Sequence, residues 1–357
     1  MLVRIARRSG ALALLLSLFA FPATARQLYE IEDLGTFGGP YSAANGINSS
    51  GDVVGWAQEP GGTPWGFLLV GTSRINLTHF DGPFTAEALG LSNNLEESCG
   101  WGLNGLGQRR AVVWVFDLII DLGTFGGNEA QAYDMNDFGR TAGWAQNAAG
   151  NHRPFRFLNL SLTDLGTLGG ANGEGHGINN PGTIVGWSEL LSDADAAAPP
   201  RHATRWSPGG TILDLGTLGG THSVAEEIND AGQIVGGADT NLAPSQPEHA
   251  FLRLPSPAYG LPAGMNDLGT LPETTESHAW SINAGGEVVG YTYPTDAQSC
   301  RAFLWDAAGG MRDLNNHIIT DDDWVLLIAR GVNDGGQIVG AGLHAGVLRA
   351  YRLTPVP

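Results

Sequence analysis

The sequence has little positive charge, few cysteines and no lysine. Its 357 residues include 18 basic residues, all of them arginine, against 36 acidic ones, which gives a formal net charge of −18. A chain this acidic repels phosphate backbones and anionic head groups, so we expect neither nucleic-acid nor membrane-surface partners. The two cysteines, Cys99 and Cys300, lie far apart and show no C-x-x-C spacing, which argues against a disulfide framework and a cysteine metal site. Stability must therefore come from burial and hydrogen bonding.

Long apolar runs are also scarce, and the one that stands out lies at the N-terminus. It extends from Ala11 to Phe21 and is too short for a membrane-spanning helix, which needs about 20 residues. Arg4, Arg7 and Arg8 precede it, and a small-residue cleavage site ending at Ala25 follows. We predict that residues 1–25 are a secretory signal peptide. The mature chain is then secreted, extracellular or periplasmic, and contains no membrane span.

Glycine is abundant, with 53 residues, and one phrase recurs seven times. The phrase is Ile-Asn-x-x-Gly-x-Ile-Val-Gly, with weaker copies in two places. Its asparagines are Asn48, Asn93, Asn136, Asn179, Asn229, Asn283 and Asn333, at spacings of 45, 43, 43, 50, 54 and 50 residues. Asn-x-x-Gly is typical of a hairpin turn in which the asparagine bonds its own backbone and the glycine adopts a positive φ. A period of this length indicates a repeat architecture.

Two further phrases accompany the copies of the first. One is built around His-Ala-Phe, as at His249 and in the related Arg301 copy, and the other is Asp-Leu-Gly-Thr-Leu-Gly-Gly, as from Asp164 and Asp214. Together the three phrases closely resemble the HAF repeat of bacterial extracellular proteins, over essentially all of the mature chain. The resemblance implies a bacterial extracellular protein and implies very little about activity.

The repeat unit predicts the fold. Each unit has the pattern of four strands in roughly 40–50 residues, which is the size of one propeller blade. The mature chain begins with a strand of the fourth type, Leu28 to Leu34, and ends with a strand of the third type, Arg349 to Leu353. Pairing them completes a last blade and removes an exposed edge. We predict an all-β single domain over residues 26–357, a seven-bladed β-propeller of four-stranded blades whose last blade is closed by the N-terminal strand. A β-solenoid and a pair of sandwiches are the less favoured alternatives.

A carboxylate recurs at the start of the Asp-Leu-Gly phrase. The residues are Asp33, Asp121, Asp164, Asp214, Asp267 and Asp313. A ring of such groups could bind calcium. We favour the structural interpretation, in which each aspartate accepts hydrogen bonds from the backbone of its own turn.

Candidate ligand-binding residues come from positions where the repeat varies. The first-ranked set lies seven residues before the repeat asparagine, in the connection from the fourth strand to the first, and contains Tyr41, Glu129, Asn172, His222 and Glu276. On the same face, insertions fall at Ser188–Pro200, Ala238–Glu248 and Tyr291–Ser299. The second-ranked set lies three residues before the asparagine, nearer the opposite mouth of the channel, and contains Tyr133, His176, Glu226, Trp280 and Arg330.

The sequence contains no nucleophile elbow, phosphate loop, dinucleotide fingerprint or histidine metal motif. We therefore expect no cofactor and no metal. The favoured function is a monomeric, non-catalytic binding or scaffolding module for an extracellular glycan or protein. The alternative is a propeller-fold polysaccharide hydrolase or lyase, in which Glu129 and Glu276, with His222 or Tyr41, act as acid, base or nucleophile. The ligand and any catalytic residues stay open.

Overall fold

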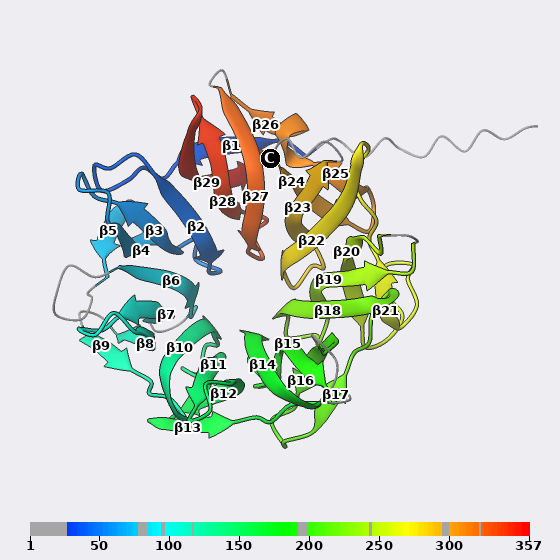
Figure 1. Ribbon diagram of the computed structural model, residues 1–357. Coiled ribbons are helices and arrows are strands. Elements are labelled where there is room, and N and C mark those ends of the chain that lie inside the picture. The colour runs from blue at the N-terminus through cyan, green and yellow to red at the C-terminus, as the bar shows by residue number, and fades with distance from the viewer. Residues whose placement is uncertain are drawn as a thin grey trace, which may run out of the picture.

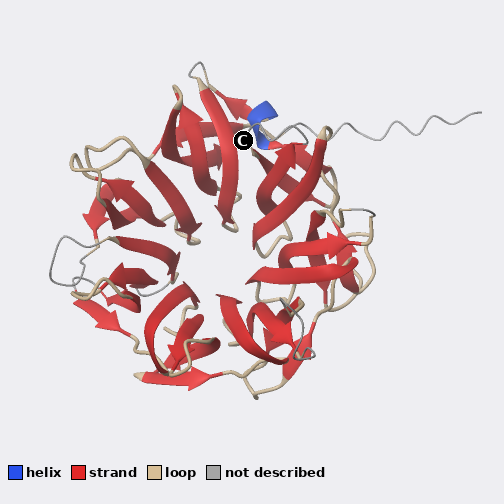
Figure 2. Cartoon of the chain, viewed as in Figure 1, coloured by secondary structure: helices blue, strands red, loops and turns tan. Residues whose placement is uncertain are grey.

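The chain forms a ring of β-sheets around a central channel (Figures 1 and 2). This computed structural model describes residues 27–77, 85–93, 97–115, 118–191, 199–242, 245–294, 300–320 and 323–357, so the predicted signal peptide lies outside the described residues. Six sheets have four strands and one has five. The fold is a seven-bladed β-propeller, as predicted, with four antiparallel strands in each blade and, in the last blade, a fifth strand that pairs in parallel. Within the described part of the chain, no helix is long and apolar enough to cross a membrane.

In each blade the strands follow one another from the channel outward. Blade 1 contains β2 (Ser42–Ile47), β3 (Val53–Gln58), β4 (Pro64–Val70) and β5 (Ser73–Asn76). Blade 2 contains β6 (Ala86–Leu91), β7 (Glu97–Leu103), β8 (Arg109–Val115) and β9 (Leu118–Asp121). Blade 3 contains β10 (Gly126–Met135), β11 (Thr141–Asn147), β12 (His152–Leu158) and β13 (Ser161–Asp164). Blade 4 contains β14 (Gly169–Ile178), β15 (Ile184–Leu190), β16 (Arg201–Trp206) and β17 (Ile212–Asp214).

The remaining blades continue the pattern. Blade 5 contains β18 (Gly219–Ile228), β19 (Ile234–Thr240), β20 (Glu248–Leu254) and β21 (Gly264–Asp267). Blade 6 contains β22 (Thr274–Ile282), β23 (Val288–Pro294), β24 (Arg301–Asp306) and β25 (Gly310–Asp313). Blade 7 contains β27 (Trp324–Val332), β28 (Ile338–His344) and β29 (Val347–Pro355), followed outward by β1 (Tyr29–Asp33) and β26 (Ile318–Ile319). A single 3-10 turn, η1 (Leu314–Asn316), precedes β26 among the described elements.

Strand β1 closes the ring, which confirms the prediction made from the two chain ends. It pairs antiparallel with β29, from Tyr29 opposite Pro355 to Asp33 opposite Tyr351. The Tyr29 side chain is 2% exposed and packs in the core of blade 7, with Trp324 and Tyr351 in the same cluster. An N-terminal segment therefore supplies an outer strand of the sheet that also contains the C-terminal strand.

The repeat asparagine joins neighbouring blades. In Asn333, Oδ1 accepts hydrogen bonds from the backbone N–H groups of Gly335 (3.1 Å) and Gln337 (2.9 Å), inside the turn between the first two strands of the blade. Its Nδ2 donates to the carbonyl oxygen of Asn48 in blade 1, at 3.0 Å. The same bond to the next blade is made by Asn48, Asn136, Asn179, Asn229 and Asn283. These side chains are buried, so each satisfies its own turn and a carbonyl of its neighbour.

Blade 2 corrects the sequence alignment by one residue. The buried residue at the repeat position is Ser92, whose carbonyl accepts from Asn48, and Asn93 is the residue after it. The physical reason is a longer turn: Ser92 N–H bonds the carbonyl of Glu97, five residues on, whereas Asn48 N–H bonds that of Asp52, four residues on. The identification of Asn93 as the repeat asparagine was therefore wrong, and the position three residues before the repeat residue is Leu89.

The recurring aspartates support the structural interpretation. Oδ1 of each accepts from the backbone N–H two residues later, at 2.7 to 3.0 Å. Several also pair with the first residues of the third strand, as in His202 to Asp214 and His249 to Asp267, both at 2.9 Å. The His-Ala-Phe and Asp-Leu-Gly phrases thus recur together because they form one contact within a blade. In the described residues, no group of three or more His, Cys, Asp or Glu side chains could hold a metal ion.

The bridging role of the repeat asparagine is testable with Asn333→Asp. The variant keeps the acceptor for the turn but loses the donor to Asn48 and adds a buried charge. We expect the free energy of unfolding in urea to fall by about 2–3 kcal/mol. Asn128→Asp, at an exposed position, is the matched control and should change stability by less than about 0.5 kcal/mol. Equal losses in the two variants would contradict the bridging role.

Ring closure is testable with Tyr29→Ala. Truncating this buried ring weakens the packing of β1 on blade 7 and should lower the free energy of unfolding by about 3 kcal/mol. Because β1 covers the edge of β29, we also expect faster aggregation on mild heating, measured by light scattering. The control is Glu30→Ala, on the exposed side of the same strand. A Tyr29→Ala protein as stable as this control would show that β1 does not hold the ring closed.

Candidate functional site

The wall of the channel is built from the innermost strand of each blade, and each of these strands contains a β-bulge. Register shifts occur at one equivalent place in β2, β6, β10, β14, β18, β22 and β27. The residues skipped in the pairing are Asn45, Leu89, Tyr133, His176, Glu226, Trp280 and Arg330. A bulge interrupts the alternation of side chains and re-aims the extra residue. One structural position therefore presents a different side chain to the channel in every blade.

These bulge residues line a cavity of about 380 Å³. All five members of the second-ranked sequence set belong to it, so the structure brings them together. The wall also includes Glu87, Gln131, Asp134, Glu227 and Ser281. Aromatic faces, carboxylates, an imidazole and a guanidinium thus line one cavity. A small number of polar and aromatic groups held in fixed orientations is typical of small-ligand sites.

A chain of alternating histidines and glutamates runs along the wall through four blades. His152 Nδ1 donates to Glu174 (2.8 Å), and His176 donates from Nε2 to Glu174 (3.3 Å) and from Nδ1 to Glu226 (2.7 Å). His278 donates from Nε2 to Glu226 (3.0 Å). The chain ends where Nδ1 of His278 donates to Glu248, at 2.7 Å.

The Tyr133 hydroxyl adds a donor to Glu174, at 3.2 Å. These bonds fix the rotamers of Tyr133, His176 and Glu226 before any ligand arrives.

The pairing decides the charge of this network. Burial alone favours neutral imidazole, but the hydrogen bonds and charges of Glu226 and Glu174 outweigh it and raise the pKa of His176 to about 9. In His278, burial is likewise outweighed by Glu226 and Glu248, and the pKa rises to about 10. Burial would raise the pKa of Glu174, yet His152 and His176 lower it to about 2. At neutral pH His176 and His278 are therefore positively charged, and Glu174 and Glu226, whose pKa values are lowered by these histidines, are negatively charged.

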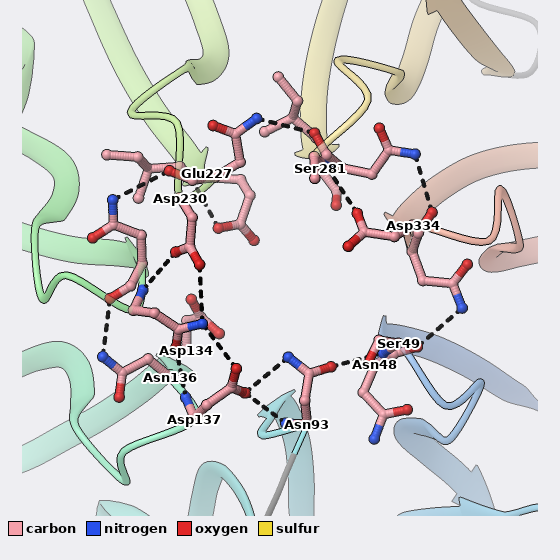
Figure 3. A pocket seen from close by; sticks show the side chains of 18 of the residues that line it. Asn48, Ser49, Asn93, Asp134, Asn136, Asp137, Glu227, Asp230, Ser281 and Asp334 are labelled. Atoms are coloured by element: carbon pink, nitrogen blue, oxygen red, sulfur yellow. Dashed lines mark hydrogen bonds between the residues drawn. The ribbon is translucent and has the colours of Figure 1, made fainter.

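A second cavity, of about 240 Å³, lies at the mouth formed by the asparagine turns (Figure 3). Figure 3 shows Asp137, Asp230 and Asp334 around this mouth. Asp137 Oδ1 accepts from the N–H of Asn93 (2.8 Å), and Asp334 Oδ1 accepts from that of Ala284 (2.8 Å). Each carboxylate thus ties its blade to the preceding one, which gives these acids a structural role.

Asp134 and Glu227 border both cavities and were not singled out by the sequence analysis. Asp134 accepts from the N–H groups of Met135 (2.7 Å) and Ile178 (2.8 Å), and Glu227 from that of Ile228 (2.9 Å). Burial is the main cause that raises the pKa of Asp134, to about 7, and that of Glu227. A sequence signal existed, because these acids occupy a position that is glycine in four other blades.

The first-ranked sequence set lies elsewhere. Glu129, Asn172, His222 and Glu276 lie within β10, β14, β18 and β22, since these strands begin earlier than expected, and Tyr41 directly precedes β2. None of the five lines either channel cavity.

Two of these residues have partners of their own. Asn172 bonds Glu189 and the backbone of His152, while His222 Nδ1 accepts from the N–H of Arg201 (3.3 Å). Within the predicted insertions, residues 192–198, 243–244 and 295–299 lie outside the described residues. A binding role for this face stays a prediction.

Comparisons with known proteins extend only to the fold. No family model and no curated protein matches the sequence. The propeller domain of the Trilobed protease from Pyrococcus furiosus is 11% identical, aligns over 92% of this chain and 94% of its own, and gives a TM-score of 0.57. YCF48 bound to D1 peptide is 11% identical over 93% and 99% of the two chains, with a TM-score of 0.51.

TolB from Acinetobacter baumannii is also 11% identical, with a TM-score of 0.49 over 86% of this chain, and the chain spans 64% of its length. The Pyrococcus domain has an open velcro topology, whereas β1 closes the ring here. At these identities the likeness defines the class, a β-propeller, and no more.

The histidine–glutamate network predicts an unusual dependence of stability on pH. The raised pKa values of His176 and His278 stabilise the folded state fully below about pH 6.5, and this contribution is lost as the pH rises through 9 and 10. The raised pKa of Asp134 also makes stability fall as the pH rises, between the ordinary pKa of an aspartate and about 7. We expect the free energy of unfolding to fall by roughly 2 kcal/mol between pH 6 and pH 10.

Urea unfolding at several pH values measures this profile. His176→Gln should flatten it above neutral pH, because the buried imidazole no longer titrates. His202→Gln is the control, since this histidine pairs with the half-exposed Asp214 at the edge of its blade. If His176→Gln and the parent protein lose stability in parallel, the network is not the cause.

Proposed function

We propose that the protein is a secreted, non-catalytic binding module of the HAF-repeat type, that its ligand is an extracellular glycan or protein, and that the ligand enters the channel. The observation that carries the proposal is the set of bulge residues. Seven different residue types at one repeated structural position converge on a single 380 Å³ cavity. A repeat maintained only for its scaffold has no need of such diversity at an inward-facing position.

The chemistry of the wall favours a glycan over a folded protein. Specific protein interfaces need roughly 1,200 Å² or more of buried surface, which a cavity of about 380 Å³ does not present. Sugars offer hydroxyl groups to carboxylates and amides, and apolar ring faces to aromatic side chains. Glu87, Tyr133 and Trp280 supply these complements on different sides of the channel.

The arrangement of carboxylates supports binding rather than catalysis. Glu129 and Glu276, the pair required by the hydrolase or lyase alternative, lie in blades 3 and 6 and outside both cavities. The carboxylates of Glu174 and Glu226 are each held by two histidines. Groups held in this way orient a ligand well, but they are poorly placed to exchange protons with it.

Retention of polysaccharides on the mature chain, residues 26–357, tests the proposal. We expect the protein to retain at least one glycan class without releasing new reducing or unsaturated ends. Trp280→Ala should weaken that retention about ten-fold by removing the aromatic face. Trp187→Ala is the matched control, because Trp187 also lies beneath an arginine but outside both cavities.

Two outcomes would contradict the proposal. Product release that Glu129→Gln or Glu276→Gln abolishes would establish the enzyme alternative. If Trp280→Ala leaves retention unchanged, the ligand binds outside the channel, and the face that carries Tyr41, Asn172 and His222 becomes the candidate.

A further inference from the structure

Arg330 carries a charge that nothing in the described protein neutralises. It lies at the bulge of β27 and lines the 380 Å³ cavity, half-buried. Its guanidinium lies over the Trp280 ring, 5.1 Å from the centroid. Among the described residues it forms no ion pair and no hydrogen bond, and the buried Nε of Arg330 and Nε1 of Trp280 both have no acceptor.

The other polar groups around Arg330 do have partners. Glu87 accepts from Nδ2 of Asn45 (3.0 Å) and from Nε1 of Trp101 (3.2 Å). Gln131 accepts from Arg109 at 2.7 Å. The imidazole of His176 is bonded at both nitrogens to glutamates. Among the described residues of this wall, buried polar atoms without a partner remain on Asn45 (Oδ1) in blade 1 and on Trp280 and Arg330, which lie side by side in blades 6 and 7.

Several arginines of the described chain form no ion pair, Arg205 and Arg253 among them, but Arg330 is the one of these that lines the channel cavity. The chain carries 36 acidic residues against 18 basic ones, so carboxylates are plentiful, yet none is placed against Arg330. A charge partly removed from water is costly unless it is paired, and a cation–π contact compensates only in part. The planar fork of a guanidinium matches a carboxylate in bidentate geometry. The cavity therefore offers an empty position for one carboxylate of a ligand.

The rest of the wall limits what else that ligand can carry. Glu87 and Glu226 face the same cavity and would repel a second anionic group, but they accept hydrogen bonds from hydroxyls. The Trp280 ring beside the carboxylate position provides a flat apolar surface. One carboxylate, several hydroxyls and one apolar face together describe a uronic acid.

We propose that the channel cavity binds a uronate residue of an extracellular polysaccharide, with Arg330 holding the carboxylate and Trp280 packing against the sugar ring. This inference rests on the proposed function and names its ligand class. Arg330 then supplies the specificity for acidic over neutral sugars, while the histidine–glutamate network of blades 3 to 6 keeps the remaining wall rigid.

Isothermal titration calorimetry with a galacturonate disaccharide and its neutral galactose counterpart tests the proposal. We expect the parent protein to bind the acidic disaccharide about 10–100-fold more tightly, in line with one charge-assisted bidentate contact. Arg330→Gln should lose that preference and retain any binding of the neutral sugar. Arg330→Lys, which keeps the charge without the fork, should be intermediate.

Arg201→Gln is the matched control. Arg201 also lies over a tryptophan ring, at 5.5 Å, but lines neither channel cavity, so its loss should leave the affinities unchanged. Equal affinity of the parent protein for both disaccharides, or undiminished uronate binding by Arg330→Gln, would overturn the uronate assignment while the proposed glycan module stands. Binding of a peptide through its terminal carboxylate, with neither sugar bound, would overturn the uronate assignment too. If no glycan or peptide binds, the proposed function itself fails.

Discussion

The bond from the repeat asparagine to the next blade is the interaction on which the ring depends. Adjacent blades of a propeller contact each other mainly through apolar side chains, and such contacts resist separation without fixing the angle between sheets. A buried asparagine amide does fix the angle between two blades, because it must bond both the backbone of its own turn and a carbonyl of the next blade. A misplaced blade would leave these polar groups unpaired in the interior. Asn333 and Asn48 extend this arrangement across the junction between the last blade and the first. The aspartates one residue further on, such as Asp137 and Asp334, add a second circle of bonds.

A scaffold held in this way leaves the bulge position free to vary. The bulge lies only three residues before the asparagine, so every blade presents its bulge side chain at the same height in the channel. Tyr133, His176 and Glu226 then meet across blade boundaries and are locked by hydrogen bonds. The rigid repeats thus fix where the bulge side chains lie, and substitutions at this one site per blade change the chemical groups that line the channel. Substitutions at these residues can therefore change the chemistry of the channel wall without changing its frame.

Periodicity was sufficient to predict the fold, whereas the directions of individual side chains could not be predicted from it. Repeated turns and strands, and the offset of Leu28–Leu34 against Arg349–Leu353, were sufficient for the propeller and its closure. The alternation rule does not reveal a bulge, so Trp280 and Arg330 were ranked below residues near the insertions. Partners from third strands, such as His152 and Glu248, could not be assigned because only the folded blades bring them to Glu174 and His278. The repeat residue of blade 2 was also misassigned to Asn93, because a turn one residue longer places Ser92 at the repeat position.

The closure of blade 7 has a consequence for the order of assembly. Asp33 pairs with Tyr351, so the first strand of the described chain contacts the last. Contacts of such sequence separation form slowly, because the entropy of closing the whole loop is lost before the pairing stabilises anything. Six blades can form from local hairpins while β1 has no partner. The ring therefore becomes complete in a single late event, and a chain cut short before β29 would persist as an open arc with two unsatisfied edges, distinguishable from the finished molecule by shape alone.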